Sequence, residues 1–137
     1  MAIRNDYLLS MITSFTESLT QTELEGHGGL SVSAMDTYGD IVGRILDMPA
    51  DAVLELSPSS LVTMMQISAV DEKLAVYMVY TLQRMADVCG VENSALADVR
   101  RAQARAIADA YGFPETEVPP EVQDAREERD ASPSDSE

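Results

Sequence analysis

The sequence has no tryptophan, one cysteine and one histidine, and each scarcity narrows the classes of protein to consider. Aromatic residues make up only 5% of the 137 residues, so Met, Ala, Leu and Val must fill any core. The single cysteine, Cys89, excludes an internal disulfide and favours a reducing compartment. No apolar run approaches the roughly 18 residues of a membrane span, and the first residues do not resemble a secretory signal. We therefore expect a soluble cytoplasmic protein without a membrane segment.

Basic residues are also scarce, because nine Lys and Arg stand against 24 Asp and Glu, and the formal net charge is −15. Such an excess of negative charge repels the phosphate backbone of DNA or RNA, so we expect no nucleic-acid partner. The basic residues Arg100, Arg101 and Arg105 form the only cluster of their kind. We interpret them as a solvated helix face paired with Asp98 and Asp109, with an anion site as the alternative.

Much of the sequence has apolar residues at the spacing of an α-helix. The widest apolar surface belongs to residues 71–89 and predicts a central helix that contacts neighbours on several sides. Its apolar residues recur at intervals of four and three, at Leu74, Met78, Leu82, Met85 and Cys89. A capping box between Ser68 and Asp71 should start this helix, and Gly90 should end it.

Further helices are predicted on both sides of the central one, over residues 5–25, 33–47, 50–56, 58–68 and 94–111. The last should form an antiparallel hairpin with the central helix. Its predicted inward face comprises Leu96, Val99, Ala102 or Gln103, Ala106, Ile107 and Ala110. The glycines Gly39 and Gly43, four residues apart, should allow close approach of a neighbouring helix.

Residues 115–137 differ from the rest of the chain in composition. They contain nine acidic residues, three prolines and almost no large apolar side chain. Such a segment cannot bury enough surface to offset its ordering entropy, so we expect a disordered acidic tail. The predicted fold is a single all-α domain over residues 1–114, with five to six helices arranged as hairpins in a repeat-like bundle.

Three short motifs occur in a recognisable order, Arg4-x-Asp6-Tyr7-Leu8-Leu9-x-x-Ile12, Leu54-x-Leu56-Ser57-x-x-Ser60-Leu61 and Asp71-x-Lys73-Leu74. Followed by an alanine-rich hairpin, they resemble an uncharacterised bacterial family, a domain of unknown function with a tetratricopeptide-like helical build. The resemblance covers about residues 4–112 and implies a fold but no activity, cofactor or functional residue. The hairpin departs from a true tetratricopeptide repeat, because its later alanines are out of register with that motif.

Motifs for phosphate binding, dinucleotide binding and nucleophilic catalysis are missing from the sequence. His27 lies in a glycine-rich stretch, residues 26–29, that we interpret as a linker; with Glu23 and Glu25 it offers only an adventitious metal site. Cys89 has no histidine close in sequence, and we expect a buried, inert thiol. We predict no catalytic residue, no metal site and no cofactor.

Acidic residues occur as pairs at helical spacing, Asp36 with Asp40 and Asp47 with Asp51. A dicarboxylate metal site in a helical bundle normally uses Glu-x-x-His motifs, and the chain has none, so we interpret these pairs as solvated.

Methionines give the one hint of a partner-binding surface, at Met64, Met65, Met78 and Met85. Met-rich surfaces adapt to varied partners, although methionines also fill cores. The sequence thus favours a non-catalytic protein-interaction or oligomerisation module whose partner is another protein or a second copy. A small-molecule or ion-binding helical protein is the alternative, and an enzyme is disfavoured.

Overall fold

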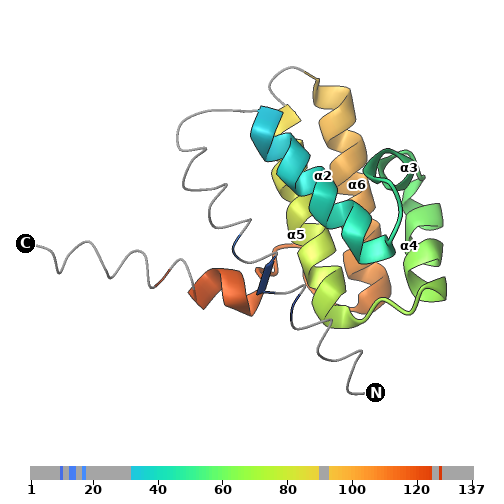
Figure 1. Cartoon of the computed structure of the whole chain (residues 1–137). Coiled ribbons are helices and arrows are strands. Elements are labelled where there is room, and N and C mark those ends of the chain that lie inside the picture. Colours follow the sequence, from blue (N-terminus) through green and yellow to red (C-terminus); the bar gives the residue numbers. More distant parts are fainter. Residues whose placement is uncertain are drawn as a thin grey trace, which may run out of the picture.

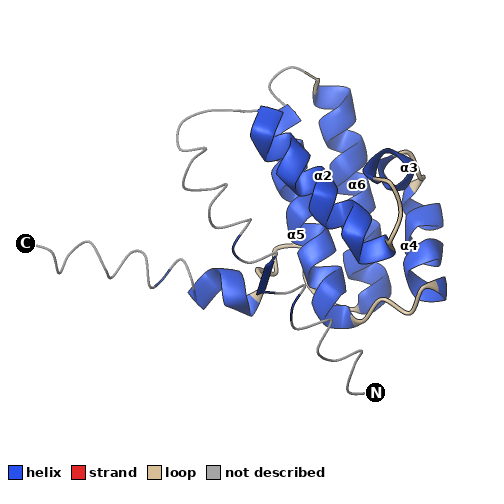
Figure 2. Cartoon of the chain, in the orientation of Figure 1, coloured by secondary structure: helices blue, strands red, loops and turns tan. Residues whose placement is uncertain are grey.

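The computed structural model describes residues 32–89 and 93–124, together with the isolated positions 10, 13, 14, 17 and 127. All regular structure in this part of the chain is helical, and no strand occurs in it (Figure 2). The predicted all-α fold is therefore confirmed. In chain order the helices are α2 (Val32–Leu46), α3 (Ala50–Leu54), α4 (Pro58–Ile67), α5 (Glu72–Cys89) and α6 (Ser94–Tyr111) (Figure 1). The helix predicted over residues 5–25 lies outside the described residues except at four positions.

Local capping signals fix both ends of α6 and the start of α4. Ser57 accepts a hydrogen bond on its side-chain oxygen from the Ser60 backbone N–H at 3.2 Å, and Pro58 follows as the first residue of α4. Asn93 caps α6 in the same way, and Gly112 ends that helix in the left-handed conformation with φ 83°. These caps explain why the predicted ends of α4 and α6 agree closely with the structure.

The start of α5 differs from the prediction. The Leu74 backbone N–H donates to the Asp71 carboxylate at 3.0 Å, so Asp71 is the cap and the helix begins one residue later. The predicted capping box is wrong because Ser68 belongs to the C-terminal end of α4, where its N–H donates to the Met64 carbonyl. Ala69, with φ 57°, makes the left-handed turn between the two helices.

Helix α5 forms the centre of the molecule. All its side chains from Leu74 to Leu82 are buried, which requires neighbours on several sides. Helices α2 and α6 pack directly on α5, while α4 packs on α6 and α3 packs on α2 (Figure 1). The Asn93 N–H donates to the Cys89 carbonyl at 2.8 Å and closes the connection between α5 and α6.

The buried side of helix α6 differs in part from the predicted one. Val99 is 43% exposed and Ala102 and Ala110 are exposed. The predicted Gln103 and Ile107 are buried, and the remaining buried positions are Ala97, Arg100, Ala104 and Ala108. The prediction assumed one partner helix, whereas α6 packs against both α5 and α4, so its buried surface is wider and displaced.

The packed part of the chain extends beyond the predicted domain end at residue 114. Pro119 and Val122 are buried, and Val122 belongs to the same core cluster as α5. Residues 120–124 form a helical turn beside the bundle, coloured orange-red in Figure 1. The beginning of the predicted tail is thus ordered, because it supplies apolar side chains that the composition of the whole tail conceals. The rest of that tail lies outside the described residues, apart from position 127.

Candidate interaction surface

Three of the four methionines predicted to form a partner-binding surface are core residues. Met65 and Met78 are fully buried, and Met85 is 2% exposed. In this conformation they cannot contact a partner, because their helical spacing directs them into the core. Met64 alone remains partly exposed, and it lies on the outward side of α4.

The outward side of α4 carries a shallow hollow of about 350 Å³. Its lining residues are Leu56, Ser59, Ser60, Thr63 and Met64. Ile67 is 73% exposed and follows Thr63 and Met64 by four and three residues, so it continues the same helix face. We call these six residues the α4 outer face.

The α4 outer face is free of charge in a strongly acidic protein. Residues 56–70 contain no Asp, Glu, Lys, Arg or His, although the net charge is −15. Two of its three hydroxyl groups bond locally, since Thr63 donates to the Ser59 carbonyl at 3.0 Å and Ser60 accepts from Ser57 at 3.0 Å. Covering this face therefore desolvates no charged group, as in the core of a protein–protein interface. The charge-free stretch was the sequence signal that could have located it.

A buried polar network holds the N-terminal end of α4 against α6. The Gln103 side-chain amide donates to the carbonyls of Leu56 at 2.8 Å and Leu54 at 3.2 Å. Arg100 donates from Nη1 to the Leu54 carbonyl at 3.0 Å and to the Gln103 amide oxygen at 3.1 Å. Burial lowers the pKa of the Arg100 guanidinium, and the nearby Cys89 opposes that shift. These bonds satisfy carbonyls between α3 and α4 that would otherwise be buried without donors.

The predicted solvated face of Arg100, Arg101 and Arg105 is wrong for Arg100, which is 8% exposed. Arg101 pairs with Asp87 at 3.3 Å and Arg105 pairs with Glu115 at 3.2 Å, so the predicted partners on α6 itself are also wrong. The three guanidinium groups take different partners and do not converge on a common anion site.

The C-terminal end of α4 is fixed by a second long-range hydrogen bond. The Tyr111 hydroxyl donates to the Val70 carbonyl at 2.7 Å. Burial, followed by the charge of Asp71, raises the pKa of Tyr111, so the hydroxyl keeps its proton and remains a donor. The segments that flank α4 on both sides are therefore hydrogen-bonded to α6.

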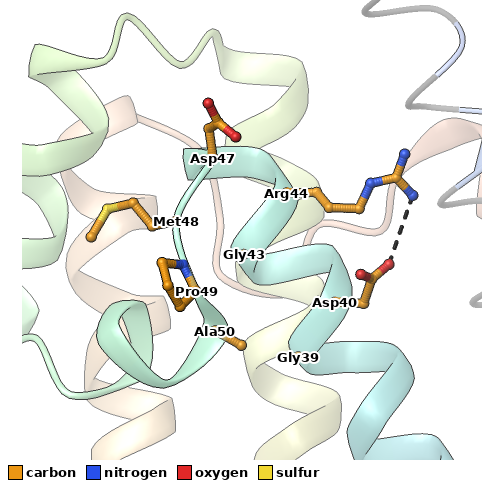
Figure 3. Close-up of a pocket in the computed structure, with 8 residues that line it drawn as sticks. All are labelled: Gly39, Asp40, Gly43, Arg44, Asp47, Met48, Pro49 and Ala50. Carbon is orange, nitrogen blue, oxygen red and sulfur yellow. Dashed lines mark ion pairs between the residues drawn. The ribbon is translucent and has the colours of Figure 1, made fainter.

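A second hollow, of about 450 Å³, lies between α2 and the turn into α3 (Figure 3). Its lining residues are Gly39, Asp40, Gly43, Arg44, Asp47, Met48, Pro49 and Ala50. A Cβ atom on Gly43 would lie 2.6 Å from the Met48 carbonyl oxygen, so this glycine is needed for the turn to pack on α2. The predicted close approach therefore exists, although it is made by a turn.

The charged side chains around this second hollow are exposed. Asp40 and Arg44 form an ion pair at 3.7 Å, and the Asp47 carboxylate points away from it (Figure 3). This arrangement has the features of a solvated surface and lacks a desolvated acid–base pair.

The other candidate residues do not come together into a site. Asp36, Asp40, Asp47 and Asp51 are all exposed. Cys89 is partly buried, with its Sγ 3.9 Å from the Ala86 carbonyl oxygen. His27 lies outside the described residues. Within the described residues there is no group of three or more His, Cys, Asp or Glu placed to hold a metal ion.

Within the same part of the chain, no helix combines the length and apolar character needed to cross a membrane. No family model, no curated protein and no solved structure matches the chain. The resemblance to an uncharacterised tetratricopeptide-like family therefore stays a prediction.

Proposed function

We propose that the protein is a non-catalytic interaction module of the cytoplasm, and that the α4 outer face binds its protein partner. The observation that carries this proposal is the 73% exposure of Ile67 on a charge-free helix of a chain with net charge −15. Charged residues are depleted in the centres of protein interfaces, whereas ordinary solvated helices carry charge on their outer side.

The rigidity of α4 supports the same function. The segments before and after α4 are bonded to α6 through Gln103 and Tyr111, and these bonds limit the movement of the helix between them. A preorganised surface loses less conformational entropy on binding than a flexible one. Ile67 and Met64 would supply the apolar contacts, and burial of apolar area contributes about 25 cal/mol per Å².

The test replaces Ile67 by lysine in the full chain and compares this variant with Val99→Lys. Val99 is the other exposed large apolar side chain among the described residues, and it lies on α6 outside the α4 outer face. Each protein serves as bait in lysate of the native host, and sedimentation velocity measures self-association in parallel. We expect Ile67→Lys to reduce recovery of the partner, or of a second copy, at least tenfold.

Val99→Lys should leave that recovery unchanged, and both variants should retain the far-UV circular dichroism of the parent. Equal recovery by both variants would place the binding surface elsewhere. A parent that captures nothing and sediments as a monomer at all concentrations would contradict the proposal.

A small-molecule-binding function is the second candidate, and the hollow of about 450 Å³ beside α2 is the observation that favours it. Such a ligand would be held between Arg44 and the turn that follows α2. Native mass spectrometry of the purified chain tests this candidate. A bound mass that disappears in Ala50→Trp, where a large side chain fills the hollow, would support it over the interaction module.

A further inference from the structure

The segment that follows α6 returns to the domain and docks on it. Val122 is fully buried in the core cluster, and Val118 packs against that cluster. Pro119, which follows Val118, is also buried. We call residues 117–124 the docked segment; Figure 1 shows its helical turn in orange-red. Two valines and a proline thus provide its apolar attachment.

A carboxylate provides its polar attachment. Glu121 forms an ion pair with Lys73 at 2.6 Å, and its other oxygen accepts a hydrogen bond from the Tyr77 hydroxyl at 3.3 Å. Lys73 and Tyr77 are four residues apart and therefore share one face of α5. Burial raises the pKa of the Glu121 carboxyl, but the hydrogen bonds from Lys73, its own backbone N–H and Tyr77 outweigh burial, and the pKa lies below its ordinary value.

The backbone hydrogen bonds of the docked segment run within the chain around it. The N–H groups of Val122 and Gln123 donate to the Pro119 carbonyl, and the Glu117 N–H donates to the Pro114 carbonyl, each at 3.0 Å. Side chains therefore make the attachment to α5. This is how a short peptide ligand is held, with apolar anchors for affinity and one charge contact for specificity.

We propose that the surface beneath the docked segment is a peptide-binding site whose present occupant is an intramolecular ligand. Its exchangeable ligand is a segment of a partner protein with the same chemistry, in which a glutamate directly precedes an aliphatic residue and prolines come before both. Lys73 and Tyr77 recognise the carboxylate, and the space filled by Val122 accepts the aliphatic side chain. The site does not include the α4 outer face, and it stands whether or not that face binds a partner.

The docked segment also determines how tightly a partner peptide must bind to displace it. A ligand tethered by a short connection competes at an effective concentration of about millimolar. A free peptide can occupy the site only when it binds tightly or when the docked segment has been released. Covalent connection to α6 therefore makes the segment an autoinhibitory contact.

The test uses the full chain with the double substitution Glu121→Lys and Val122→Asp, which removes both anchors. The probe is a fluorescent peptide of residues 115–124, and binding is measured by fluorescence anisotropy. We expect the released variant to bind the probe at least tenfold more tightly than the parent does. Adding Lys73→Glu should abolish that binding.

A released variant that keeps its helical circular dichroism but binds no probe would overturn the proposal. So would binding that is indifferent to Lys73→Glu. If the double variant does not fold, the pair Glu121→Gln and Val122→Ala releases the segment more mildly and takes the same test. A parent that forms dimers with rising concentration, lost on Glu121→Lys, would identify a second copy as the occupant and overturn the proposal of a separate partner.

Discussion

Helices α4 and α5 follow each other in the chain, and they differ in the relation between charge and burial. Helix α4 contains no charged residue, yet Ser60, Thr63 and Ile67 face solvent. Helix α5 carries charged residues on both sides of its middle, including Lys73 and Arg84, yet every side chain from Leu74 to Leu82 is buried.

Position in the assembly explains the difference. Helix α5 is covered by α2, α6 and the docked segment, and its charged residues lie beyond the fully buried stretch. Helix α4 packs against α6, and its opposite side has no cover within the described residues. Apolar composition therefore predicts that a helix is packed but not how many sides are packed. An exposed side without charge then requires an explanation of its own, which the proposed binding function supplies.

The largest expected effect comes from a matched pair of alanine substitutions, one on α5 and one on α4. Leu82→Ala removes a fully buried side chain of α5 and should lower the free energy of unfolding by about 2–5 kcal/mol. Ile67→Ala on α4 should change it by less than about 0.5 kcal/mol, because that side chain is already largely in water. Urea denaturation followed by circular dichroism measures both. Equal losses would show that the exposed side of α4 is packed in solution.

The next test separates α4 from α6. Gln103→Ala leaves the Leu56 carbonyl without its donor and should cost about 1–3 kcal/mol, whereas the exposed Gln66→Ala should be nearly neutral. Amide hydrogen exchange should show faster exchange in α4 than in α5 after Gln103→Ala. Uniform acceleration along both helices would mean that the network supports the whole domain rather than the attachment of α4.

A smaller effect of opposite sign is expected inside α5. Thr81 is fully buried, and its hydroxyl has no hydrogen-bond partner among the described residues. Thr81→Val keeps the shape of the side chain and removes the unpaired group, so it should raise the free energy of unfolding by about 1 kcal/mol. Thr63→Val on the exposed side of α4 is the matched control and should not stabilise the protein. Destabilisation by Thr81→Val would show that the hydroxyl is bonded in solution.

The smallest effect concerns the docked segment that covers one side of α5. Glu121→Gln should cost no more than about 1 kcal/mol near neutral pH, because the carboxylate is one-third exposed. The folded-state pKa of Glu121 is lowered, so its contribution is present above its ordinary pKa and is lost as pH falls through the folded value. The stability difference between parent and Glu121→Gln should therefore shrink as the pH falls below the ordinary pKa of a glutamate, about 4.3, and vanish once the folded-state carboxyl is protonated. A difference that grows on acidification would assign the effect to another group.

Local chemistry made the helices predictable. The serine–proline start of α4 and the glycine after α6 are signals that act within a few residues, and the structure places helix ends there. The central position of α5 also followed from sequence, because apolar residues around most of a helix require neighbours on most sides.

Long-range partners were beyond such reasoning. Arg100 looks like a surface residue in sequence, and only the fold brings it and Gln103 to the carbonyls of Leu54 and Leu56, nearly half the domain away. The burial of Val122 was not predicted, because the tail was judged by the average composition of residues 115–137. One buried valine changes that average composition very little. Of the α4 outer face only Met64 was predicted, because methionine content was weighed where absence of charge was the better signal.

The order in which the chain is made gives the attachment of α4 a further consequence. Residues 54 and 56 bond to Gln103, which lies 47 or more positions later, so α4 leaves the ribosome well before its partner helix exists. At typical rates of synthesis, roughly several seconds separate the two. During that time the residues of the inner side of α4, with Leu61 and Met65, have no α6 to cover them, and both sides of this segment are open to solvent. Translation speed across residues 68–111 thus sets how long the nascent chain presents a wholly uncharged segment to chaperones and to other chains.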